Sequence, residues 1–113
     1  MVTTCFRVDA SPETGTGHLM ECLALADSFG RTFSSESLFL VNRFEPACRI
    51  LEEQGCSFRT VPRGLSHGGE REWISHVLEG IGARLLVCSL LDREDAFYGG
   101  LRGSGCILLV ILD

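Results

Sequence analysis

Short apolar runs alternate along the chain with segments that have helical periodicity. The apolar runs predict strands at 5–10, 37–42, 57–61, 84–90 and 106–112. The segments between them predict helices at 17–29, 45–54, roughly 70–80 and about 93–102. The second, fourth and fifth runs are almost continuously apolar, as in parallel strands that helices cover on both faces. The pattern therefore predicts an α/β domain with a doubly wound, Rossmann-like parallel sheet of five strands.

Local signals set the expected end of the first helix and the start of the third. Gly30 follows the periodic run of the first helix and is expected to cap it. The segment 62–69, PRGLSHGG, is rich in turn residues and is expected to be a loop. In the third helix, Glu70, Glu72 and Glu79 are expected to form a solvated face.

Length and charge narrow the class of protein. The 113 residues suit a single domain spanning 1–113, and the net charge of -5 argues against nucleic acid or an anionic membrane as the main partner. All ten basic residues are arginine, which excludes a Schiff-base lysine and a phosphate-loop lysine. The N-terminus lacks the apolar core of a signal peptide, and no apolar run reaches the roughly 18 residues of a membrane span.

The cysteines and histidines give no sign of a metal site. The six cysteines form no C-x-x-C pair and mostly lie in apolar runs, so reduced thiols in a cytoplasmic protein are expected. His18, His67 and His76 are too far apart in the sequence for a zinc motif. We therefore predict no metal and no cofactor.

The stretch 9–26, DASPETGTGHLMECLALA, is the candidate functional segment. It follows the first strand, and ligands of open α/β sheets bind beyond the carboxyl ends of the strands. His18 falls in the first turn of the helix, where a neutral imidazole could accept a proton. Met20 occupies the place of the third glycine of G-x-G-x-x-G, so the dinucleotide interpretation is weak. The alternative is that His18 is only a hydrogen-bonded surface residue.

Taken as a whole, RVDASPETGTGHLMECLALADSF resembles the N-terminal signature of the UDP-sugar hydrolases of the pseudaminic acid pathway. These enzymes release UDP from a 2,4-diacetamido-2,4,6-trideoxy hexose and have the two-domain B-type glycosyltransferase fold. The matching positions are Arg7, Asp9, Ser11, Gly15, Gly17, His18, Leu23, Leu25 and Ala26. The resemblance is specific over about twenty residues, and beyond residue 30 it is one of element order and length.

The resemblance implies a role for each residue of the loop. His18 would be the catalytic residue that activates water, or a hydroxyl in the related glycosyltransferases. Asp9 and Ser11 would shape the floor of the pocket. Gly15 and Gly17 would let the loop pass close to the sugar and phosphate of a UDP-sugar, and Thr16 between them is expected to bind the substrate. The chain would be the sugar- or acceptor-side half of a cleft that a nucleotide-binding domain or a partner subunit completes.

The sequence departs from the family pattern at two places in the expected pocket. Glu21 stands where the family commonly has an arginine, so an anion replaces a cation that could meet phosphate. Glu21 is one turn from His18 and is expected at the substrate, although it could simply complement the helix dipole. Cys88, Ser89 and Leu90 replace an Asp-x-Tyr-like element. These departures favour an alternative function, a non-catalytic sugar-nucleotide-binding module or partner subunit.

Overall fold

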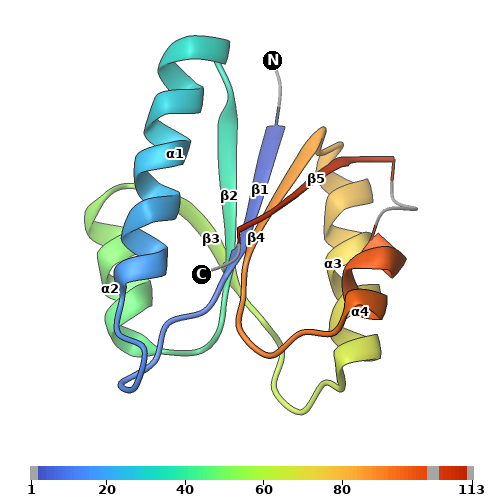
Figure 1. Ribbon diagram of the computed structural model, residues 1–113. Coiled ribbons are helices and arrows are strands. Elements are labelled where there is room, and N and C mark those ends of the chain that lie inside the picture. Colours follow the sequence, from blue (N-terminus) through green and yellow to red (C-terminus); the bar gives the residue numbers. More distant parts are fainter. Residues whose placement is uncertain (1–2, 102–104, 112–113) are drawn as a thin grey trace.

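The computed structural model describes residues 3–101 and 105–111. A sheet of five parallel strands runs through its centre in the order β3-β2-β1-β4-β5. The strands are β1 (Thr3–Val8), β2 (Glu36–Val41), β3 (Ser57–Thr60), β4 (Leu85–Ser89) and β5 (Ile107–Val110). The helices are α1 (Gly17–Phe33), α2 (Glu45–Glu53), α3 (His67–Ile81) and α4 (Asp95–Leu101). In Figure 1, α1 and α2 cover one face of the sheet, and α3 and α4 cover the other.

Alternation along the central strands divides the core into two layers. On β1, Cys5 belongs to the cluster beneath α3 and α4, while Phe6 belongs to the cluster beneath α1 and α2. Phe6 pairs in register with Phe39 of β2, and their rings stack with centroids 4.9 Å apart. Apolar residues on both faces explain why these strands appear in the sequence as continuous apolar runs.

The register brings the ends of three strands to the same edge of the sheet. Val8 at the end of β1 pairs with Val41 of β2 on one side and with Ser89 of β4 on the other. Residues that follow these strands therefore meet at the carboxyl edge. From β1 the chain adds β2 and β3 on one side of the sheet, and it then adds β4 and β5 on the other side. The carboxyl edge between β1 and β4 is therefore the topological switch point, where ligands of such sheets bind.

Two of the predicted helix boundaries are wrong. The first helix continues through Gly30 to Phe33, and Ser34 caps it with a left-handed φ of 53°. The aromatic stripe explains the extension, since Phe29 packs near Phe6 and contacts Phe33. The third helix begins at His67, inside the segment predicted to be a loop. The Ser66 hydroxyl accepts a hydrogen bond from the Gly69 amide at 3.0 Å, an N-cap that starts the helix early.

Three expectations from the sequence concern the thiols, membrane spans and metal sites. Cys5, Cys22, Cys48, Cys56 and Cys88 are free, and the first two and Cys88 are buried in the core. Within 3–101 and 105–111, no helix combines the length and apolar character that a membrane crossing requires. The same residues contain no group of three or more His, Cys, Asp or Glu side chains arranged to hold a metal ion.

Candidate functional site

The loop between β1 and α1 forms a closed turn at the carboxyl edge of the sheet. Ser11 and Gly15 pair across it, with the Gly15 amide donating to the Ser11 carbonyl at 2.7 Å. The Ser11 hydroxyl accepts from the Thr14 amide at 3.0 Å and contacts the Thr14 hydroxyl at 2.8 Å. These bonds are local, so the sequence of the loop determines its shape. The turn leads directly into α1 and places His18 in the first turn of that helix.

Asn42, the residue after β2, fastens the start of this loop to the sheet. Its Oδ1 accepts from the Ala10 amide at 3.0 Å, and its Nδ2 donates to the Ala10 carbonyl at 2.6 Å. The side-chain amide of Asn42 thus bonds both backbone groups of Ala10, as a neighbouring strand would if the sheet continued by one residue. It holds Asp9 and Ser11 on either side of Ala10 in a fixed position.

His18 contacts the end of β4. Its Nδ1 lies 2.9 Å from the hydroxyl oxygen of Ser89, a residue that is 71 positions away in the sequence. Ser89 is buried, whereas His18 is half-buried. The contact fixes one nitrogen of the ring against a rigid strand, while the ring itself stays accessible from the carboxyl edge.

A cavity of about 240 Å³ lies at this edge, and His18 and Ser89 form part of its wall. The wall comes from the β1–α1 loop, the first turn of α1, the end of β2 and the segment after β4. The lining residues are Asp9, Ala10, Ser11, Thr14, His18, Asn42, Ser89, Leu91, Asp92 and Arg93. The lining combines hydroxyl, amide, imidazole, guanidinium and carboxylate groups with apolar surface, which suits a small ligand that has several polar groups.

A network of four charged side chains, two of them buried and two partly exposed, supports the floor of the cavity. Arg7 on β1 donates through Nε to Glu70 of α3 at 3.1 Å and through Nη1 to Asp9 at 2.6 Å. Arg93 donates through Nη2 to the other oxygen of Glu70 at 3.0 Å and lies 3.6 Å from Asp9. The network is electrically balanced, because two guanidinium groups face two carboxylates. Both cations are therefore already engaged by protein anions.

The prediction that Glu70 lies on a solvated helix face is wrong. Glu70 is buried with 5% exposure, whereas Glu72 and Glu79 are exposed as predicted. The physical reason is its place on α3, since Glu70 lies one and two turns before Ile74, Val77 and Leu78 on the buried stripe. A carboxylate is tolerated on this stripe because Arg7 and Arg93 pair with it.

The structure brings together three of the seven residues predicted for the site. Asp9, Ser11 and His18 line the cavity, although Asp9 also belongs to the buried charge network. Gly15 and Thr16 shape the turn and the entry to α1, and Gly17 is the first residue of that helix. Glu21 is exposed on α1 and is not among the residues that line the cavity. Contact of any of these residues with a substrate stays a prediction.

Sequence reasoning assigned neither Asn42, Ser89 and Arg93 nor the supporting Glu70 to the site. Asn42, Ser89 and Arg93 line the cavity, and Glu70 holds Arg93 from beneath. Asn42 carried a signal, because a polar residue directly after a buried apolar run is placed at the carboxyl edge. Glu70 could have been recognised by its helical spacing to Ile74.

Cys88 and Ser89 occupy the end of β4, where the resemblance leads one to expect a carboxylate. Their side chains point to opposite faces, so Cys88 lies in the cluster beneath α3 and α4 while Ser89 meets His18. Burial raises the pKa of the Cys88 thiol to about 12, so that it stays protonated and unreactive at neutral pH. Ser89 is therefore the chemically available group at this strand end.

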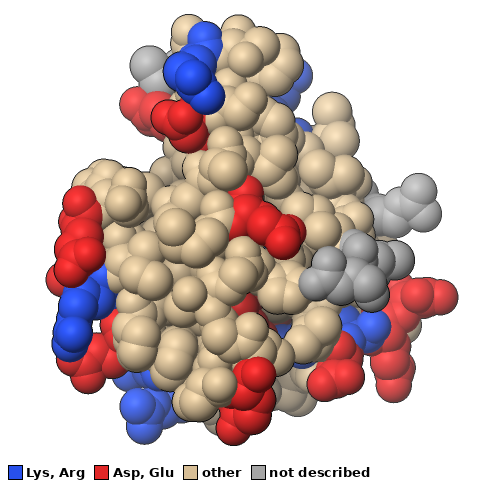
Figure 2. Space-filling view, turned by 60° about the vertical axis from the view of Figure 1, so that its left-hand side comes forward, with Lys and Arg blue, Asp and Glu red and all other residues tan. Residues whose placement is uncertain are grey.

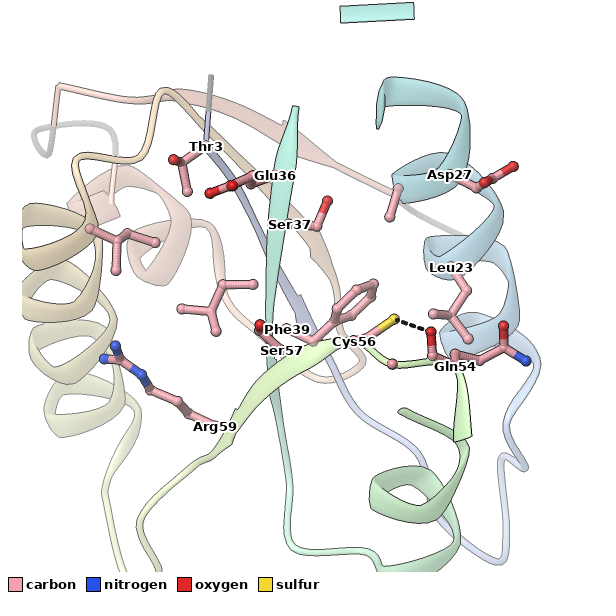
Figure 3. Close-up of a pocket in the computed structure, with 14 residues that line it drawn as sticks. Thr3, Leu23, Asp27, Glu36, Ser37, Phe39, Gln54, Cys56, Ser57 and Arg59 are labelled. Atoms are coloured by element: carbon pink, nitrogen blue, oxygen red, sulfur yellow. Dashed lines mark hydrogen bonds between the residues drawn. The ribbon is translucent and has the colours of Figure 1, made fainter. Parts of the chain in front are cut away.

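A larger hollow of about 790 Å³ lies at the opposite end of the sheet. Figure 3 shows Thr3, Glu36 and Ser37 at the amino ends of β1 and β2, and further along the hollow Cys56, just before β3, and Arg59 on β3. Ligands of doubly wound sheets bind at the carboxyl edge rather than at this one. The hollow also contains no histidine among its lining residues. We therefore assign the candidate site to the smaller cavity.

The surface over α1 and α2 has no continuous positive patch among the described residues. Figure 2 shows the side of the molecule that includes α1 and α2. Most of the surface in this view is uncharged, and its acidic and basic side chains stand in small separate groups. Two exposed arginines of these helices are paired with acids, Arg31 with Asp27 on α1 and Arg49 with Glu45 on α2. A polyanion would find no extended binding surface on this face.

Comparison with solved structures relates the fold to glycosyltransferases. The chain superposes on a glycosyltransferase from Rickettsia africae ESF-5 with a TM-score of 0.73, over 96% of this chain and 29% of that one, at 10% identity. It superposes on MurG from Acinetobacter baumannii with a TM-score of 0.72, over 97% of this chain and 34% of that one, at 14% identity. Comparison with protein-family models and with curated proteins gives no significant match.

These likenesses confirm the predicted fold class. The chain has the architecture of the N-terminal half of a B-type glycosyltransferase, and it spans about a third of the length of each of the two structures. The specific resemblance to the pseudaminic acid pathway hydrolases stays a prediction.

Replacing Gly15 with alanine is expected to destabilise the chain by about 1 kcal/mol, because Gly15 has a φ of +71° that L-residues adopt only with strain. Gly17→Ala is the matched control, since Gly17 has an ordinary φ and open space around its Cα. Urea unfolding of both variants measures the difference. Equal stabilities of the two variants would contradict the strained geometry of the turn.

Proposed function

We propose that this chain is the sugar- or acceptor-side domain of a UDP-sugar hydrolase or a related glycosyltransferase. The observation that carries the proposal is the position of His18, which Ser89 holds at 2.9 Å in the wall of a polar cavity at the carboxyl edge. The fold shared with glycosyltransferases and the resemblance of residues 7–29 to the UDP-sugar hydrolases of the pseudaminic acid pathway support it.

In this proposal His18 acts as a general base. The ring accepts a proton from water as the water oxygen attacks the anomeric carbon of the sugar. The bond between that carbon and the diphosphate oxygen breaks, and UDP leaves with the bonding electrons. If a sugar hydroxyl replaces the water, the same proton transfer yields a glycoside, so the residues at the cavity would serve either hydrolysis or transfer.

The charge network favours a sugar over a diphosphate as the ligand of this cavity. Arg93 is the only cation among the described lining residues, and it is paired with Glu70 and Asp9. A diphosphate needs cations that are not already neutralised. We therefore propose that a second domain or a partner subunit supplies them and completes the cleft. The free thiols of Cys5, Cys22, Cys48, Cys56 and Cys88 support a cytoplasmic location.

A second candidate function follows from the same charge balance. A chain whose arginines are neutralised and whose α1 carries Glu21 could bind the sugar part of a nucleotide sugar without turning it over. It would then act as a binding module or as a partner subunit. The two candidates differ in UDP release by the complete assembly and not in the location of the ligand.

Titration of the ¹⁵N-labelled chain with a UDP-N-acetylhexosamine tests the location of the ligand. We expect amide shifts in the loop 9–18 and at Ser89 that exceed those caused by UDP alone, because the sugar occupies the cavity. Shifts confined to the larger hollow, or identical shifts with UDP, would overturn the proposal. Adding the second domain or subunit and measuring UDP release then separates the enzyme from the binding module.

A further inference from the structure

We propose that Ser89 is a positioning residue that sets the tautomer of His18. In this arrangement the Ser89 hydroxyl oxygen accepts a hydrogen bond from Nδ1–H, so that the lone pair of the ring is on Nε2. The inference rests on the proposed function, because it assigns the nitrogen through which His18 would accept a proton. It concerns a pair of residues that the resemblance does not supply, since the related family has a carboxylate-bearing element at this strand end.

The contact between His18 and Ser89 joins a half-buried ring to a buried hydroxyl and is not a contact between two exposed side chains. Ser89 is 2% exposed and ends β4, whose preceding residues in the strand are Leu85, Leu86, Val87 and Cys88. A hydroxyl buried after four such residues needs a hydrogen-bond partner. The Nδ1 atom of His18 provides it at 2.9 Å across 71 residues of sequence.

The backbone around Ser89 is fixed from both sides. Ser89 pairs in register with Val8 of β1, and on the other side of β4 the Cys88 carbonyl accepts from the Ile111 amide at 2.8 Å. The hydroxyl is therefore held by backbone pairing on both sides of β4, whereas His18 is half-buried at the start of α1. The hydrogen bond that one ring nitrogen makes sets which of the two nitrogens carries the proton.

A serine at this position differs chemically from a carboxylate. A carboxylate would orient the ring as well, but it would add a third acid to a cavity that Asp9 and Asp92 already line. The hydroxyl can accept from Nδ1–H without adding charge. Ser89 thus orients the imidazole and leaves the charge balance of Arg7, Asp9, Glu70 and Arg93 undisturbed.

The tautomer is measurable in the chain without any substrate. In long-range ¹H–¹⁵N spectra of the neutral ring, we expect the signature of a protonated Nδ1 and an unprotonated Nε2 for His18. In Ser89→Ala we expect the share of the Nδ1-protonated tautomer to fall, because Nδ1–H loses the hydroxyl oxygen that accepts from it. Ser89→Thr, which keeps the hydroxyl, should restore it. His67 and His76 lie outside the cavity and serve as internal controls that should not change.

The wild-type spectrum alone can overturn the proposal, even if a variant fails to fold. A protonated Nε2 in the wild type would mean that Ser89 donates to Nδ1, and the assignment would be wrong. An unchanged tautomer in folded Ser89→Ala would show that another group sets the ring. Neither outcome depends on whether a UDP-sugar is the substrate.

Turnover of the complete assembly provides the second readout. Ser89→Ala should lower kcat by roughly 10- to 100-fold with little change in KM, the range seen when the partner that orients a metal-ligating histidine is removed. Ser89→Thr should recover most of the loss. If the tautomer responds as expected and no UDP release is found in any variant, the positioning role stands and the proposed enzymatic function fails.

Discussion

Replacing Glu70 with alanine is expected to destabilise the folded chain by about 3–5 kcal/mol, the usual cost of removing one partner from a buried ion pair. Arg7 is 2% exposed and donates to Glu70 through Nε, while Arg93 donates to the second carboxylate oxygen. Without Glu70, the buried Arg7 and the partly exposed Arg93 face Asp9 alone, so two cations share one carboxylate. Urea unfolding followed by circular dichroism measures the loss.

Glu72→Ala is the matched control for this prediction. Glu72 lies two residues further along α3, is exposed, and its replacement removes the same charge from a chain of net charge -5. We expect its effect to stay within about 0.5 kcal/mol. Glu70→Gln should fall between the two, since the amide keeps one acceptor oxygen but not the charge. Similar losses in Glu70→Ala and Glu72→Ala would show that the network does not support the fold.

The network of Arg7, Asp9, Glu70 and Arg93 also explains how charged groups can lie at the floor of the cavity, since each charge there has a partner of opposite sign. Asp9 contacts Arg7 at 2.6 Å and lies 3.6 Å from Arg93, so its carboxylate is held in place while a third of it remains exposed. The residue that begins the candidate loop is therefore fixed by the core of the domain. Structural support and ligand contact are compatible at Asp9 because its two oxygens meet different arginines.

The order of the elements could be predicted because it depends on local signals. The apolar runs of β1, β2 and β4 and the periodic segments between them are properties of neighbouring residues. The helix ends were predicted less well where a distant or capping contact decides them. Gly30 lies inside α1 because Phe29 and Phe33 continue the aromatic packing, and Ser66 starts α3 through its own side chain.

The sequence predicted only those residues of the site that lie in one continuous segment, the loop between β1 and α1. Asp9, Ser11 and His18 lie within ten residues of each other and could be read from the loop. The contacts between His18 and Ser89, and between Arg7 and Glu70, join residues 71 and 63 positions apart. Such long-range contacts depend on strand order and register, which cannot be read from the local patterns of a single sequence. The pairing of Val8 with both Val41 and Ser89 supplies that information.

Replacing His18 with alanine is expected to lower kcat for UDP release by the complete assembly by roughly 10²- to 10⁴-fold, the usual contribution of a general base. The fold should survive, because His18 is half-buried and its side chain contributes little to the core. Binding of the UDP-sugar should change little, since the loop is closed by Ser11, Thr14 and Gly15 rather than by the ring. Steady-state kinetics and titration of the same variant separate the two effects.

His76→Ala is the control for this substitution, because His76 is exposed on α3 and lies outside the cavity. Its turnover should equal that of the wild type. Unchanged turnover in His18→Ala would remove His18 from the chemistry and leave the cavity as a binding site alone. A different result would link the rate to the orientation of the ring. In that result, Ser89→Ala shows part of the loss in turnover seen in His18→Ala, and Ser89→Thr turns over substrate at nearly the wild-type rate. The rate would then depend on the contact between the start of α1 and the end of β4, which joins the two halves of the sheet at the switch point.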